Sequence, residues 1–313
     1  MLAIPQIGFS RSVKKQNVDP VHLADWLEAC LLFDDNRVTR ADVTDVLLGT
    51  EICDEDDMAD KIASDGWSEL TARKRQGYRD LIEIRPRQLL LSCAWEENVP
   101  YAFLVALASL RLFKIDPTEW STYAEQGDLF EALAVELFGP IFPEWEVYRA
   151  GWSPDNPVTV KEIIDQLALR MATENAANLD AWVNEKGNDG GLDIVCYRSF
   201  EDDRDAMPTL FVQCASGADW RDKVTTPNAV QWFKWLDASV IPATGIAMPY
   251  VVPSIELKRA ALTGQAVVLD RLRLLTKWLG TGRAIPAELE AKIVAWIAGF
   301  LTVLHRDHIS KAT

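Results

Sequence analysis

The chain has 313 residues, of which 49% are hydrophobic, so it can bury a sizeable core and we expect two domains. Its formal charge of -15 excludes binding of nucleic acid by phosphate neutralisation alone; a nucleic-acid role would need a local basic patch, metal ions or a partner. Five cysteines at scattered spacings, with no CxxC pair, argue against a disulfide framework or a zinc site and favour a reducing compartment.

The N-terminal stretch "MLAIPQIGFSRSVKK" does not have the order of a signal peptide, because its basic residues follow the apolar ones. No window approaches the roughly 18 consecutive apolar residues that span a bilayer. We therefore expect a cytoplasmic protein with no membrane segment.

The first third of the chain has helical apolar spacing. "DPVHLADWLEACLLF" places Leu23, Trp26 and Leu27 on one face, and "TRADVTDVLLG" begins at the candidate cap Thr39. Strand signals are few there. We predict that residues 1–117 form a mainly helical domain that serves recognition, homodimerisation or docking of a protein partner.

The segment "RPRQLLLSCAWEENVPYAFLVALASLRLF" is predicted to form two helical pieces separated by Pro100, because proline interrupts a helix.

From residue 118 onward, predicted strands and helices alternate. "EQGDLFEALAVELFG" is predicted to be a helix with a broad apolar face, and it is followed by a strand in "WEVYRAG" and a helix in "VKEIIDQLALRMATE". Further strands are expected in "TGIAMPYVV" and "AVVLD", with helices between and after them. This pattern predicts an α/β domain over residues 118–313, with a sheet covered on its faces and helices at the C-terminal end.

Two strand-like runs, "LDIVCY" and "TLFVQCA", flank a turn-prone segment and are predicted to pair as a hairpin. Asp193 stands at the mouth of the first strand, and Gln213 stands near the end of the second. An oxygen from each, with a carboxylate from a preceding helix, can bind Mg²⁺ or Mn²⁺, and Glu131 is available on that helix. Such a metal ion can polarise a phosphodiester and activate a water molecule.

These residues resemble a known family. "DGGLDIV" and "LFVQCAS", with "GDLFEAL" upstream, are similar to motifs of the PD-(D/E)XK restriction-endonuclease-like superfamily, and most similar to Mrr-type nucleases. The resemblance covers roughly residues 125–280. It implies a central mixed β-sheet flanked by helices and a metal-dependent DNA endonuclease, with Glu131, Asp193 and Gln213 as the metal-binding and catalytic residues.

The pattern departs from the family at one position, because Ala215 stands where the family has a lysine two residues after the glutamine. That lysine positions the water and stabilises developing charge. We expect Lys223 to replace it, with Lys186 as the second choice.

Each candidate also has a purely structural explanation. Asp193 can serve turn chemistry, Gln213 can be a hydrogen-bonded core amide, and Glu131 and Lys223 can be solvated surface residues. Three functions therefore stay open: an active DNA endonuclease of a prokaryotic restriction or anti-phage defence system, a catalytically inactive nuclease-fold subunit that acts as a binding or assembly partner, and an acidic interaction protein.

Overall fold

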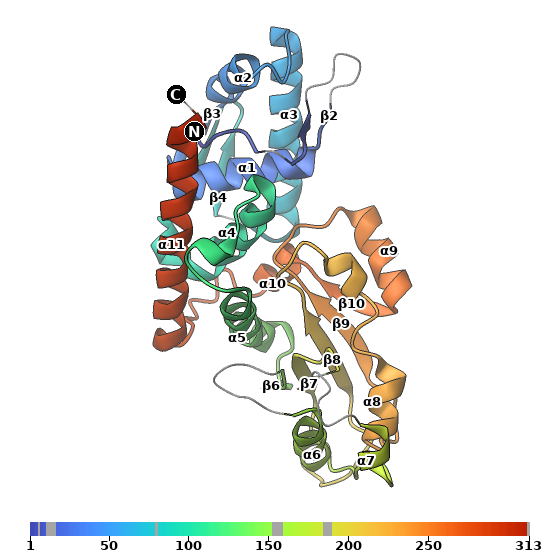
Figure 1. Ribbon diagram of the computed structural model, residues 1–313. Helices are drawn as coiled ribbons and strands as arrows, with labels where there is room; N and C mark the ends of the chain where they lie inside the picture. The colour runs from blue at the N-terminus through green and yellow to red at the C-terminus, as the bar shows by residue number, and fades with distance from the viewer. Residues whose placement is uncertain (6, 11–16, 79–80, 152–158, 184–189, 312–313) are drawn as a thin grey trace. The chain divides into compact units, whose positions relative to one another are not determined.

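The computed structural model describes residues 1–5, 7–10, 17–78, 81–151, 159–183 and 190–311. The chain divides into two compact units, each described by itself below (Figure 1). Unit 1 comprises Met1–Tyr123, Pro249–Val251 and Arg271–Thr313, and unit 2 comprises Ala124–Met248 and Val252–Asp270. Within the described residues, no helix combines the length and the apolar character that a membrane span requires.

Unit 1 is mainly helical, as predicted. Its helices are α1 (Pro20–Phe33), α2 (Arg40–Gly49), α3 (Asp56–Arg73), α4 (Val99–Phe113), α10 (Arg271–Thr276) and α11 (Ala287–Lys311). Local sequence fixes where the first two begin. The Asp19 side chain accepts a hydrogen bond from the Val21 backbone N–H at 2.9 Å and caps α1, while Thr39 and Asp42 form a reciprocal capping box at the start of α2.

Unit 1 also contains short strands that helical periodicity did not predict. The strands β3 (Arg37–Thr39), β5 (Gln88–Leu91) and β4 (Ile82–Arg85) form an antiparallel sheet in that order, and β1 (Phe9–Ser10) pairs with β2 (Asn17–Val18). The predicted helical piece before Pro100 is therefore wrong. Its residues form β5 and a 3₁₀ turn, and Pro100 lies in the first turn of α4, where its missing N–H costs nothing.

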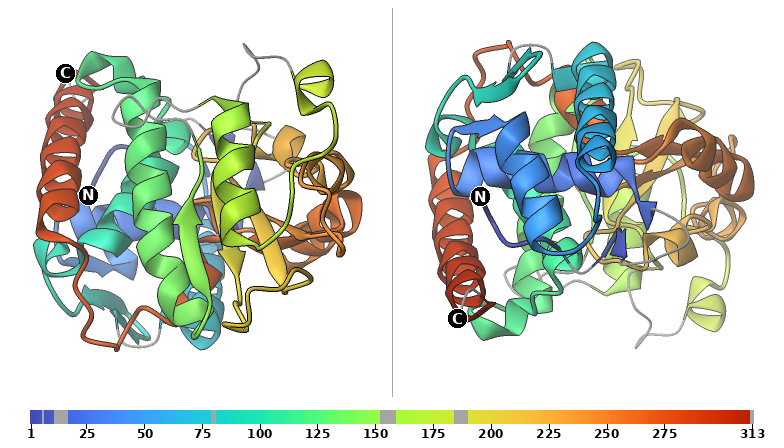
Figure 2. Two further views of the ribbon diagram at one scale, coloured as in Figure 1. Left: turned by 90° about the horizontal axis from the view of Figure 1, so that it is seen from below. Right: turned by 90° about the horizontal axis from the view of Figure 1, so that it is seen from above.

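The C-terminal helices belong to unit 1, whereas the predicted domain boundary placed them with residues 118–313. The long, unbroken helix α11 packs on α4 (Figure 2). Its Trp296 lies edge-on to Phe103 and Trp120, and its Phe300 lies edge-on to Phe33 and tilted against Trp120. This aromatic packing ties the two ends of the chain into one core.

A buried ionic cluster also joins the early and late segments of unit 1. The Arg271 guanidinium, fully buried at the start of α10, donates to Asp25 at 2.6 Å and to Glu28 at 2.7 Å on α1. Arg73 of α3 reaches the same two carboxylates at 2.8 and 3.3 Å. Two buried carboxylates thus face two buried guanidinium groups, and Arg73 also contacts the partly exposed Glu69 of α3 at 3.1 Å.

Unit 2 is built on a five-stranded mixed sheet. Its strands β6 (Glu146–Arg149), β7 (Ile194–Tyr197), β8 (Thr209–Cys214), β9 (Ala243–Ala247) and β10 (Ala266–Leu269) lie in the order β10-β9-β8-β7-β6. The pairs β6–β7 and β7–β8 are antiparallel, and β8, β9 and β10 are parallel. The predicted α/β class and the predicted hairpin of β7 and β8 are confirmed.

Helices flank this sheet. They are α5 (Tyr123–Ile141, beginning at the boundary residue), α6 (Val160–Arg170), α7 (Leu179–Trp182), α8 (Ala229–Trp235) and α9 (Ser254–Gly264). Side chains from α6, α7 and α8 form one buried cluster with Val195 and Tyr197 of β7 and Phe211 of β8. Because side chains alternate along a strand, this cluster marks one face of the sheet.

Candidate functional site

Asp193 and Gln213 are cross-strand neighbours. Ile194 of β7 pairs with Val212 of β8, so the next pair in the antiparallel register brings Asp193 opposite Gln213. The Gln213 side-chain amide donates a hydrogen bond to Asp193 Oδ2, and the Cys214 backbone N–H donates to the same oxygen at 2.5 Å. Asp193 is 3% exposed, so these contacts hold a buried carboxylate in one orientation.

A double-glycine turn leads the chain to Asp193. Gly190 and Gly191 have φ values of 64° and 70°, in the left-handed region that glycine adopts without strain. A Cβ at Gly191 would lie 1.9 Å from Thr226 Cγ2 and 2.8 Å from Gln213 Oε1. The two glycines are therefore required both by the backbone conformation and by the close approach of neighbouring side chains.

We expect Gly191→Ala to lower the free energy of unfolding by at least about 2 kcal/mol, since strain at positive φ and the collision with Thr226 act together. Gly127→Ala is the matched control. Gly127 lies in α5 with open space around its Cβ position, so the same substitution is expected to stabilise by up to about 1 kcal/mol. Urea unfolding followed by circular dichroism measures both, and equal stabilities for the two variants would contradict the packing described.

Glu131 reaches the site from α5 in a charged network. Arg149, the last residue of β6, donates from Nε and Nη2 to Glu131 Oε2 at 3.2 and 3.0 Å, and from Nη2 to Asp128 Oδ1 at 2.6 Å. Asp128 and Glu131 are one turn apart on α5, so both face the end of β6. Arg149 thereby orients Glu131 and neutralises part of its charge.

The two carboxylates of Glu131 and Asp193 meet above Gly151. A Cβ at Gly151 would lie 3.0 Å from Glu131 Oε2 and 3.3 Å from Asp193 Oδ1. The backbone N–H of Gly151 donates to the Asp193 carbonyl at 3.1 Å, which fixes this glycine beside the start of β7. Glycine at this position allows both carboxylates to approach the backbone, since a Cβ there would be in tight contact with each of them.

The charges around the site shift its titrating groups. Burial alone would lower the pKa of Arg149, but its hydrogen bond to Asp128 and the charges of Glu131 and Asp128 outweigh burial and raise that pKa. Burial, together with the charges of Asp193 and Glu131, raises the pKa of the Cys214 thiol well above its usual range. The guanidinium thus stays charged, and the thiol stays protonated and unsuited to nucleophilic chemistry.

The structure brings Glu131, Asp193 and Gln213 together at the ends of β7 and β8, and their chemical roles stay predictions. Ala215, at the position of the family's lysine, is fully buried. Lys223 ends the 3₁₀ turn η4 (Trp220–Lys223), and the structure gives its side chain no ion pair with any described residue. Lys186 lies outside the described residues.

The sequence did not lead us to predict Arg149 and Asp128 as residues of the candidate site. The sequence held a signal for each: Arg149 is a charged residue within the predicted strand "WEVYRAG", and Asp128 precedes Glu131 by three residues, the spacing of neighbours on a helix. Neither signal could be linked to Asp193, because the link depends on the register between β6 and β7.

The oxygen atoms of Glu131, Asp193 and Gln213 could supply part of the coordination shell of a hard divalent cation. Mg²⁺ commonly takes one or two protein carboxylates and completes its shell with water and phosphate oxygens. Glu131 Oε2 and Asp193 Oδ1 supply two such oxygens around one point. Across the described residues, no group of three or more His, Cys, Asp or Glu side chains is placed to hold a metal ion, so the protein share would be these two carboxylates with the Gln213 amide.

The topology defines an α/β protein with a five-stranded mixed sheet, and polar and acidic side chains lie at the ends of β7 and β8. No protein-family model matches the chain, and no curated protein matches its sequence. Among solved structures, the restriction endonuclease FokI bound to DNA matches at 12% sequence identity and a TM-score of 0.27. The match covers 91% of this chain and 49% of that one, so this chain spans about half its length. A TM-score this low does not establish a shared fold or activity.

Proposed function

We propose that the protein is a metal-dependent DNA endonuclease that hydrolyses phosphodiester bonds. The observation that carries the proposal is that Glu131 Oε2 and Asp193 Oδ1 lie 3.0 and 3.3 Å from one point, the Cβ position of Gly151, at the ends of paired strands. Mg²⁺ or Mn²⁺ bound there would polarise the phosphodiester and lower the pKa of an attacking water. The biological setting we propose is a prokaryotic restriction or anti-phage defence system.

Each residue of the candidate site has a defined role in this proposal. Asp193, fixed by the Cys214 backbone N–H and the Gln213 amide, presents Oδ1 to the cation. Arg149 orients Glu131 so that its carboxylate faces Asp193. A half-turn of the Gln213 amide would place its oxygen beside the carboxylate, an arrangement that a bound cation favours and a bare carboxylate disfavours.

The cation that assists the attacking water has two candidates. Lys223 is the residue that the sequence predicts, and Arg149 is a guanidinium already in contact with Glu131. The variants Lys223→Ala and Arg149→Met should distinguish the two candidates. Removal of the group that stabilises the developing charge is expected to lower the turnover by about a hundred-fold. A variant that cuts as fast as the wild type excludes its residue from this role.

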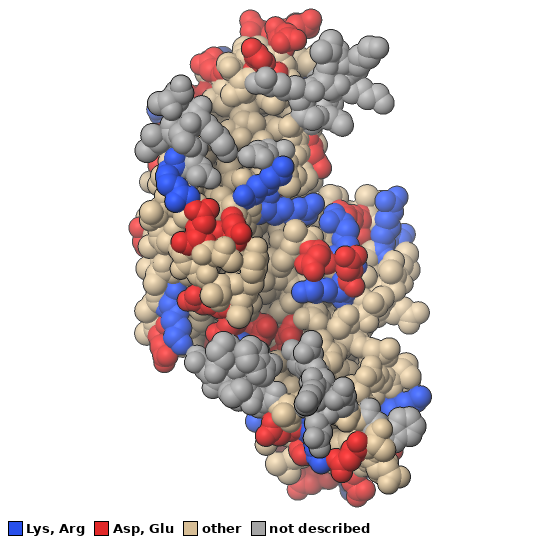
Figure 3. All heavy atoms as spheres, viewed as in Figure 1, with Lys and Arg blue, Asp and Glu red and all other residues tan. Residues whose placement is uncertain are grey.

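The surface charge limits how DNA is held. On the face in Figure 3, the visible Lys and Arg side chains are interspersed with Asp and Glu side chains. With a formal charge of -15, the protein would rely on metal ions and local contacts for its affinity. DNA binding should therefore weaken strongly when metal is removed.

Nicking of a supercoiled plasmid tests the proposal. We expect cleavage in Mg²⁺ or Mn²⁺ and none when EDTA replaces the metal ions, because the two carboxylates alone cannot activate water. Absence of cleavage with either metal ion, at low and physiological salt, would reject the endonuclease.

That outcome would support the second candidate, a catalytically inactive nuclease-fold subunit. The observation in its favour is that protein groups satisfy both carboxylates: Arg149 contacts Glu131, and Gln213 contacts Asp193. Such a subunit would bind DNA or a protein partner without cleaving DNA. We propose that unit 1 provides the surface for a partner or for a second copy of the chain.

A further inference from the structure

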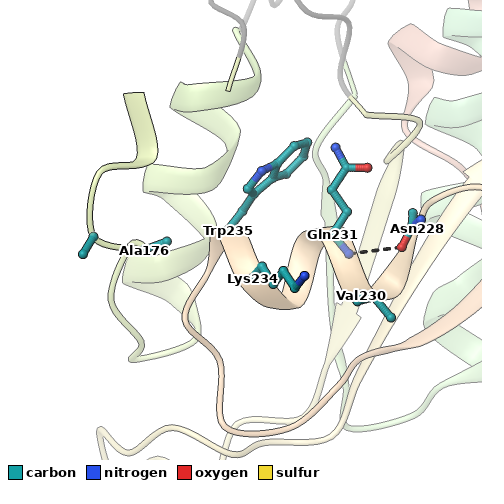
Figure 4. Close-up of a pocket in the computed structure, with 7 residues that line it drawn as sticks. Ala176, Asn228, Val230, Gln231, Lys234 and Trp235 are labelled. Atoms are coloured by element: carbon teal, nitrogen blue, oxygen red, sulfur yellow. Dashed lines mark hydrogen bonds between the residues drawn. The ribbon is translucent and has the colours of Figure 1, made fainter. Parts of the chain in front are cut away.

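A pocket of about 560 Å³ opens beside α8 in unit 2 (Figure 4). Its size is typical of sites that take a small organic group. The lining combines the indole of Trp235 with the apolar side chains of Val230 and Ala176 and with the amides of Gln231 and Asn228. The pocket therefore offers a flat aromatic surface beside hydrogen-bonding groups.

Two polar groups of this pocket have no partner among the described residues. None of those residues forms a hydrogen bond with the Gln231 amide or an ion pair with the Lys234 ammonium. Asn228 Oδ1 caps α8 by accepting from the Gln231 backbone N–H at 3.1 Å, which leaves the Asn228 amide nitrogen. In Figure 4, the Gln231 amide and the Trp235 indole project from the same side of α8.

The charge and shape of the lining favour one class of ligand. No carboxylate is present among the described lining residues, and Lys234 provides a positive charge. An aromatic face, amides that read the donors and acceptors of a ring edge, and one ammonium match a nucleotide, with its planar base and its phosphate. A cationic ligand would lack a counter-charge here.

Packing connects this pocket to the candidate catalytic site. Trp235 lies edge-on to Trp232 at 5.1 Å between ring centroids, and both indoles approach the Cβ position of Gly190, at 3.3 and 3.2 Å. The next residue, Gly191, lies against Gln213. The turn at Gly190 and Gly191 thus contacts both Trp235, which lines the pocket, and Gln213, which holds Asp193.

We propose that the α8 pocket binds an unstacked nucleotide of the DNA strand, with its base stacked on Trp235, its edge read by Gln231 and Asn228, and a phosphate at Lys234. The assignment to a DNA strand rests on the proposed function. Free nucleotide shares the same chemistry, and the experiment separates the two sources.

Binding is measured by fluorescence anisotropy in EDTA at low salt, so that no cleavage occurs, and the readout is the ratio of the affinities for two duplexes, which does not require tight binding to either. The probes are a fluorescein-labelled duplex with one unpaired adenine, the same duplex with an abasic residue in its place, and dAMP as a competitor. We expect wild-type protein to prefer the unpaired adenine by about ten-fold, because stacking of one base on an aromatic side chain is worth a factor of this order.

Trp235→Ala should abolish this preference, and Trp235→Phe should keep most of it. Gln231→Ala changes an exposed side chain, is not expected to disturb the fold, and should reduce the preference several-fold. Phe200→Ala is the matched control, because it removes an exposed aromatic side chain of the same unit outside the pocket.

Equal affinity for the adenine and abasic duplexes, or an unchanged preference in both Trp235→Ala and Gln231→Ala, would overturn the proposal. Competition by dAMP without any preference among the duplexes would overturn the assignment to a strand. A preference for unpaired adenine in a protein that never cuts plasmid would support the pocket and reject the endonuclease.

Discussion

Replacing Asp193 with asparagine is expected to reduce metal-dependent plasmid cleavage by at least about a thousand-fold. The metal ion supplies several kcal/mol of transition-state stabilisation, and each 1.4 kcal/mol corresponds to about a factor of ten in rate. Asparagine retains an oxygen that can accept from the Cys214 backbone N–H, so the variant is expected to fold. The substitution therefore removes the charge that holds the cation while keeping the local structure.

The matched control for this variant is Asp222→Ala, which removes an exposed carboxylate of unit 2 in η4. It should cut at the wild-type rate. Initial rates of nicking at saturating Mg²⁺ give the comparison, and circular dichroism verifies that both variants are folded. Full activity of Asp193→Asn would remove Asp193 from the mechanism and, with it, the reason for placing a metal ion above Gly151.

Replacing Arg271 with alanine is expected to lower the free energy of unfolding by about 3–5 kcal/mol, which is typical of breaking a buried ion pair. The variant would leave Asp25 and Glu28, both buried, with Arg73 as the guanidinium that contacts them in the described cluster. Urea unfolding measures the loss. Arg85→Ala is the control, because Arg85 and Glu83 form an exposed pair whose loss is expected to change the stability little.

The loss of unfolding free energy caused by Arg271→Ala should become smaller as the pH is lowered. Burial raises the pKa of Glu28, against the opposing charges of Arg271 and Arg73, so removing Arg271 raises it further. A carboxyl group whose pKa is raised in the folded state favours folding when protonated, and this contribution is lost as the pH rises through the raised pKa. A deficit that is equal at acidic and neutral pH would contradict the role of Glu28.

The sequence predicted the elements whose local pattern is strong. The β7–β8 hairpin follows from two runs of β-branched and aromatic residues around a turn, and the cross-strand position of Asp193 and Gln213 follows from that hairpin. Helix α2 follows from its capping box at Thr39.

The elements that could not be predicted depend on distant partners. Strand β5 has a continuous apolar sequence, "QLLL", that suits a helix equally well, and only pairing with β3 and β4 makes it a strand. The role of Arg149 depends on the placement of β6 beside β7, and the place of Arg271 depends on contacts with α1 some 240 residues earlier. The spacing of residues along the sequence does not predict these long-range contacts.

The interleaving of the two units along the chain has a consequence for dissection of the protein. Unit 1 is assembled from three separate segments, and the segment that begins at Arg271 supplies both a guanidinium for Asp25 and Glu28 and the helix that covers α4. A fragment that ends at Tyr123 would therefore keep the carboxylates of Asp25 and Glu28 without Arg271, and it would leave the apolar helix α4 without α11. Unit 2 is nearly contiguous, but an excision that joins the flanks of Ala124–Asp270 also deletes Pro249–Val251 of unit 1, whose Tyr250 carbonyl accepts from the Arg271 backbone N–H at 2.9 Å, so those residues must be kept in the linker.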